Sequence, residues 1–143
     1  MSTRELEALY DAYLAEAERV ERERKPADGL FGIGKKPSDD PCHDRFVAEL
    51  EAFLKAFAAS EPNSDSARQA LAYIYEAPQK HREPASAYWM LLAAHGMTLP
   101  LIGRLDAPDA AALRKEYAER YPRWERLPAQ KQVLSALKKQ EEA

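Results

Sequence analysis

Residue types that build β-sheets and disulfide bonds are scarce in this chain. Val, Ile and Thr together number 8 of 143 residues, whereas Ala and Leu number 42. Branching at Cβ suits pleated strands, and Ala and Leu are among the strongest helix formers. The single cysteine, Cys42, excludes an internal disulfide bond and is typical of a reducing compartment. We therefore expect one all-α domain over residues 1–143, in the cytoplasm.

The chain also lacks an excess of positive charge and a long apolar run. Its 21 Lys and Arg are balanced by 24 Asp and Glu, whereas nucleic-acid-binding domains are usually basic. The longest apolar run, Ala87 to Ala94, is far shorter than the roughly 20 residues that cross a bilayer. The first residues read as the start of a charged helix rather than as a signal peptide. We expect neither a nucleic-acid partner nor a membrane partner.

Apolar residues recur at helical spacing in five to six segments. The first helix is predicted over residues 1–25, where Ser2 and Glu5 form a capping-box pattern and Pro26 follows a charged extension. The remaining helices are predicted over residues 41–140, with a frayed tail at 138–143. Asp106 and Asp109 form a second capping pattern, which is expected to open one of these helices. The most apolar stripe belongs to the helix that begins at Pro41: Phe46, Leu50, Phe53, Leu54 and Phe57.

Two details of the later helices rest on single residues. Pro78 is expected to close the third helix, because proline cannot continue the backbone hydrogen bonding. The fourth helix is expected from about Pro84 to His95, in a central position because it is apolar over much of its circumference, with Gly96 as a left-handed terminator.

Another aromatic pattern lies near the carboxyl end. Tyr117, Tyr121 and Trp124 are spaced four and three residues apart. Arginines lie nearby, and aromatic residues interleaved with arginines can stack on bases or bind phosphates, but the intervening glutamates cancel most of the positive charge. This pattern therefore favours a core stripe flanked by solvated ion pairs.

The longest irregular stretch is the Gly- and Pro-rich segment 26–40. Loops of this length are uncommon in compact domains and are often functional or disordered. The segment contains Leu30, Phe31 and Ile33 between its glycines. Because a solvated linker rarely contains three large apolar residues, we expect the segment to pack on the helices, and we take these three residues as candidates for an interaction surface.

The same segment contains a near match to the phosphate-binding P-loop, G-x-x-x-x-G-K-K from Gly29 to Lys36. A P-loop needs a preceding buried strand, a hydroxyl after the lysine and a helix that starts there. The preceding residues are charged, Lys36 has no hydroxyl, and Pro37 disfavours a helical Lys36. The pattern is therefore interpreted as a glycine loop, in which Lys35 and Lys36 remain candidates for looser anion binding through backbone amides.

Cys42 and His43 form a second candidate site at the start of the second helix. A helix amino terminus favours a thiolate, and His43 adds a titratable group. Consecutive helical residues point about 100° apart, so His43 is not expected to reach the Cys42 thiol. A buried, unreactive cysteine is the favoured interpretation. We expect His95 to bind helix-end carbonyls and His81 to lie in a polar loop, and we predict no metal and no cofactor because no paired ligand spacing occurs.

Two functional hypotheses follow. No pattern combines a nucleophile, a base and an oxyanion donor, so no catalytic residue is predicted and an enzyme is disfavoured. The leading hypothesis is a non-enzymatic helical module that binds a protein partner or a second copy of itself. The alternative is a domain that binds a small anionic ligand, with or without catalysis, through Lys35, Lys36, Cys42 and His43.

Overall fold

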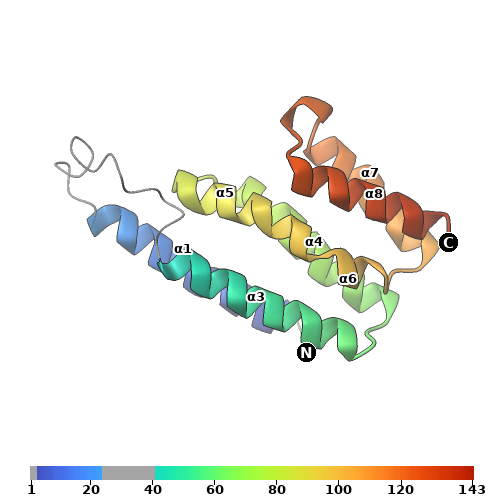
Figure 1. Cartoon of the computed structure of the whole chain (residues 1–143), viewed down its shortest axis with the longest axis horizontal. Helices are drawn as coiled ribbons and strands as arrows, with labels where there is room; N and C mark the ends of the chain where they lie inside the picture. Colours follow the sequence, from blue (N-terminus) through green and yellow to red (C-terminus); the bar gives the residue numbers. More distant parts are fainter. Residues whose placement is uncertain (1–2, 24–40) are drawn as a thin grey trace.

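The computed structural model describes residues 3–23 and 41–143, and every regular element in these ranges is helical (Figure 1). This confirms the all-α prediction. The described residues form seven α-helices rather than the five to six expected, together with two short 3₁₀ helices, η2 and η3. Their bounds are α1 Thr3–Glu23, α3 Pro41–Ala59, α4 Ser64–Lys80, α5 Ala85–Ala93, η2 Ala94–Met97, α6 Leu99–Ile102, α7 Ala107–Arg120, η3 Arg123–Glu125 and α8 Pro128–Glu141.

The helices are arranged in three groups that lie side by side (Figure 1). α1 packs along α3 on one side, and α7 packs along α8 on the other. Between these two pairs lie α4, α5, η2 and α6, which contact both of them. The middle group therefore holds the two outer pairs together.

The α1–α3 pair forms because each helix has one apolar face. α1 buries Leu6, Tyr10, Tyr13 and Ala17, which recur at spacings of three and four residues. The rings of Tyr13 and Phe46 stack with their centroids 4.3 Å apart. The α3 stripe predicted from the sequence is also confirmed, since Phe46, Leu50, Leu54 and Phe57 are buried and Phe53 packs against them.

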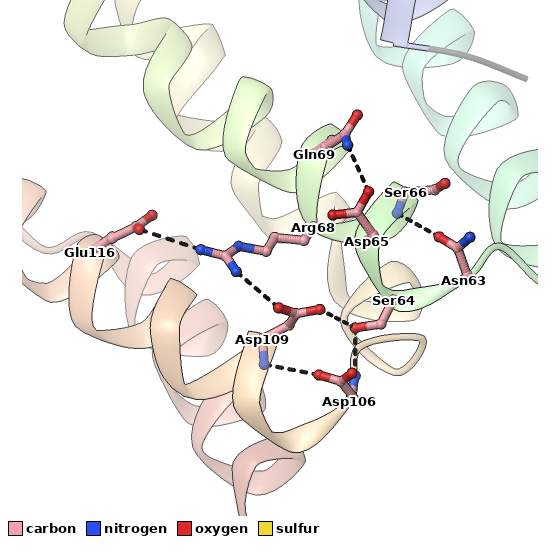
Figure 2. A network of polar contacts seen from close by, with 9 residues as sticks. All are labelled: Asn63, Ser64, Asp65, Ser66, Arg68, Gln69, Asp106, Asp109 and Glu116. Carbon is pink, nitrogen blue, oxygen red and sulfur yellow. Dashed lines mark hydrogen bonds and ion pairs between the residues drawn. The ribbon is translucent and has the colours of Figure 1, made fainter.

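A polar network joins the starts of α4 and α7 (Figure 2). The Asp106 carboxylate caps α7 by accepting from the Asp109 backbone N–H at 2.9 Å, as the capping pattern predicts. The Ser64 hydroxyl donates to Asp109 at 2.5 Å and accepts from the Asp106 backbone N–H at 2.9 Å. Arg68 donates to the second Asp109 carboxylate oxygen at 2.9 Å. These bonds fix the middle group of helices against the α7–α8 pair.

Two predicted helix ends are wrong. α4 continues through Pro78 to Lys80. Gly96 does not terminate a helix in the left-handed conformation: it lies inside η2, and no glycine of the described residues has a positive φ. The chain turns here without a glycine cap because the backbone N–H and the hydroxyl of Thr98 both donate to the His95 carbonyl, at 3.2 and 2.8 Å.

One tryptophan lies elsewhere than predicted. α5 packs in the middle group, where a central helix was expected, and its Trp89 is 56% exposed. Trp124 does not extend the Tyr117–Tyr121 stripe, since α7 ends at Arg120 and Trp124 is 83% exposed in η3. The cause is Pro122, which disfavours helical angles at Tyr121. Tyr121 accordingly has φ −121° and ψ 84°.

Candidate functional site

Most of the residues selected from the sequence lie outside the described ranges. Lys35 and Lys36, the whole Gly29–Lys36 pattern, and the apolar candidates Leu30, Phe31 and Ile33 all belong to residues 24–40, which the structure does not describe. Their proposed roles in anion binding and in partner contact therefore stay predictions.

Cys42 and His43 lie in the first turn of α3, with their side chains in the core. Cys42 is 4% exposed and His43 is 2% exposed. His43 Nδ1 lies 2.5 Å from the Tyr13 hydroxyl, so the imidazole joins α3 to α1. The buried thiol agrees with the favoured interpretation of Cys42. Neither side chain presents enough surface to hold a ligand from solvent.

An open groove lies on a face for which no sequence pattern was recognised. It is a groove of about 520 Å³ between α3 on one side and the η2–α6 segment on the other. Because pockets of roughly 300–1,000 Å³ accommodate ligands or side chains of a partner, its size is sufficient for binding. The groove is lined by Val47, Glu51, Leu54, Lys55, Gly96, Met97, Leu99 and Pro100.

One wall of the groove is the η2–α6 segment, in which some residues point into the core and others into the groove. His95 and Thr98 are fully buried, whereas Gly96, Met97 and Leu99 line the groove. Leu99 is 37% exposed. The next residues, Leu101 and Ile102, return to the core. The inward residues fix the path of the backbone, and the outward residues form the apolar surface.

The inward anchors belong to a buried polar cluster. The Tyr75 hydroxyl and the Thr98 hydroxyl are 2.7 Å apart. The Gln130 amide nitrogen donates to the Leu92 carbonyl at 2.9 Å and lies 3.4 Å from His95 Nδ1. Because an amide NH₂ can only donate, Nδ1 acts as an acceptor, and the Tyr117 hydroxyl donates to it at 2.8 Å. Residues of α4, η2, α7 and α8 thus hold the wall from inside.

Burial sets the protonation state of this cluster. It lowers the pKa of His95 from 6.5 to about 3. Burial also raises the pKa of Tyr75 and Tyr117 above the normal range. The cluster is therefore uncharged at neutral pH.

His95 is thus a residue whose role the sequence interpretation missed. It was expected to bind the carbonyls at the end of its own helix, but its side-chain partners are Tyr117 and Gln130. The spacing of apolar residues carries no signal for such a cluster, because its members come from four different elements.

The charged residues of the groove form a pair on its rim. Lys55 Nζ lies 2.9 Å from Glu51 Oε1, one helical turn away on α3, and both side chains are more than half exposed. An exposed ion pair of this kind is weak, so either side chain can leave it and pair with an opposite charge on a bound molecule. The groove therefore combines an apolar floor with one acidic and one basic group at its edge.

Two kinds of feature were sought among the described residues, a cluster of metal ligands and a helix that could span a membrane. Across residues 3–23 and 41–143, no three His, Cys, Asp or Glu side chains gather as metal ligands would. In the same ranges, no helix combines the length and the apolar character needed to cross a bilayer.

Comparisons with known proteins found no matching family model, no matching curated protein and no matching solved structure. The groove and its supporting cluster are therefore the features from which a function can be inferred.

Proposed function

We propose that this chain is a non-enzymatic, cytoplasmic interaction module that binds an apolar segment of a protein partner in the groove between α3 and the η2–α6 segment. The groove itself is the observation that supports this proposal most directly. Its floor exposes Leu99 and Met97 beside Val47, and exposed apolar surface in a concave site is typical of a binding site.

The composition of the groove favours binding over catalysis. Of its lining residues only Glu51 and Lys55 are charged, and they pair with each other. No cysteine, serine or histidine lines it, so it presents no nucleophile and no imidazole base. A preorganised wall also favours affinity, because a wall held by buried hydrogen bonds loses little entropy on binding.

The anion-binding alternative remains a competing hypothesis with less support. It requires Lys35 and Lys36, which lie outside the described residues, and it requires Cys42 and His43, whose side chains are buried. Neither Cys42 nor His43 lines the groove.

The test is photo-crosslinking from the groove. A photoreactive phenylalanine analogue replaces Leu99, and the chain is irradiated in cells that express it. We expect an adduct of raised mass that disappears when Val47→Arg fills the groove, and that persists with the matched control Glu49→Arg on the exposed face of α3. The same analogue at Lys80, exposed at the end of α4, reports background crosslinking. If the Leu99 position yields no more adduct than the Lys80 position, the proposed function is wrong.

A further inference from the structure

Among the described residues, Trp124 is the most exposed of the large apolar side chains, with 83% of its surface in solvent. In a core or an interface, an aromatic side chain such as tryptophan buries about 150–250 Å² of surface, whereas in water that surface stays exposed. Tryptophan is also the residue most enriched among the side chains that dominate binding energy between proteins. An isolated tryptophan at the tip of a helical hairpin therefore has the properties of an interface anchor.

Trp124 stands between two exposed residues of opposite charge, Arg123 and Glu125. Within the described residues, neither of these side chains forms a salt bridge. The groove has the complementary arrangement, with apolar residues beside Glu51 and Lys55 at its rim. An indole in the groove would place Arg123 to pair with Glu51, and Glu125 to pair with Lys55.

The tip and the groove of one chain do not meet. η3 connects α7 to α8, and the α7–α8 pair lies on the opposite side of the middle helices from α3 (Figure 1). Trp124 is accordingly not among the residues that line the groove. The tip can therefore occupy only the groove of another molecule.

We propose that the partner is a second copy of this chain, whose Arg123–Trp124–Glu125 tip docks in the groove, so that two copies exchange tips in a symmetric dimer. This inference rests on the proposed function, because it names the occupant of the same groove. Reciprocal exchange gives two identical contacts and closes the assembly. The contacts are small, so the dimer is weak and its population depends on concentration.

The first test measures mass against concentration by sedimentation equilibrium. The wild-type chain of 16.2 kDa should approach twice that mass as concentration rises. Trp124→Ala should weaken the dimer at least ~30-fold, the effect of removing a dominant anchor. The matched control Trp89→Ala removes the other exposed tryptophan and should leave association unchanged. A wild-type chain that stays monomeric at millimolar concentration, or that forms assemblies larger than a dimer, overturns the proposal.

The second test is complementation. Trp124→Ala retains its groove, and Val47→Arg retains its tip, so each variant alone should be monomeric. An equal mixture should form a heterodimer through the one contact that remains intact. A pair of charge reversals follows the same logic: Arg123→Glu should weaken the dimer, and Glu51→Arg in the same chain should restore it. Far-ultraviolet circular dichroism verifies that each variant is folded. If folded variants show no complementation, the proposal is wrong.

The Leu99 crosslink separates this inference from the proposed function. An adduct of two copies of this chain supports both. An adduct with a different protein, or an intramolecular adduct, overturns the second-copy proposal, and the former leaves the proposed function standing. Absence of a groove-dependent adduct overturns both.

Discussion

Replacing His95 by Gln should remove an acid-dependent loss of stability from this protein. His95 is fully buried among Tyr75, Tyr117, Tyr121 and Gln130. Protonation would place a proton on Nδ1, where the neutral ring accepts a hydrogen bond from the Tyr117 hydroxyl. A glutamine has the same acceptor type in its side-chain carbonyl but does not titrate, so it isolates the contribution of the imidazole.

The sign follows from the two pKa values of His95. The folded value of about 3 lies below the unfolded value of 6.5, so the unfolded chain takes up the proton first as the pH falls. The stabilisation by neutral His95 is present in full above pH 6.5 and is lost progressively between pH 6.5 and about pH 3. A pKa difference of one unit corresponds to about 1.4 kcal/mol. The loss from this group is therefore about 2 kcal/mol at pH 5.

The measurement is urea unfolding of the wild type and of His95→Gln at pH 7.5, 6.5, 5.5 and 5.0, followed by circular dichroism. At pH 7.5 the variant should be less stable by about 1–3 kcal/mol, because it loses ring contacts with the tyrosines. The difference should shrink by about 2 kcal/mol by pH 5. All other titrating groups are common to both chains and cancel in the comparison. Parallel stability curves from pH 7.5 to 5.0 would refute the assignment of His95 as a neutral buried imidazole.

Three further predictions concern single substitutions. Asp109→Asn should lower the urea midpoint at pH 7, because hydrogen bonds from Ser64 and Arg68 hold the pKa of Asp109 below its usual 3.8; the difference from wild type should shrink as the pH falls below 3.8 and through the lowered pKa of the folded chain, and a difference that stays constant over that range would contradict the argument. Gly96→Ala should be neutral or stabilising by about 0.4–1 kcal/mol in urea unfolding, since φ is not positive and an added Cβ meets its nearest neighbours at 3.6 Å; a clear loss of stability would show that the glycine is required. Cys42 should resist a maleimide reagent in the folded chain and react once the chain unfolds, because its side chain is buried; rapid labelling of folded protein would refute this.

Features set by neighbouring residues along the chain were predicted well. The stripes of α1 and α3 follow helical periodicity, and the start of α7 follows the Asp106–Asp109 capping pattern. These features depend on interactions within about four residues. They can therefore be recognised without knowledge of the partner helices.

Pro78 and Gly96 show where local rules failed. Proline usually ends a helix because the carbonyl four residues earlier loses its donor. α4 nevertheless continues for two residues beyond Pro78 to Lys80, and the His81 backbone N–H donates to the Ala77 carbonyl. Gly96 was expected to cap a helix, but Thr98 satisfies the His95 carbonyl instead. For Gly96, the compensating group lies outside the pattern that was interpreted.

Local sequence was enough to establish an all-α chain and most of its helix starts, because propensity, periodicity and capping act over one or two turns. Packing between helices decided which apolar side chains stay exposed to solvent. No burial was predicted for Met97 and Leu99, and Trp124 was expected in the core. They are instead the exposed side chains of the groove and of the η3 tip. Burial depends on what faces a residue across an interface, and the chain's periodicity does not contain that information.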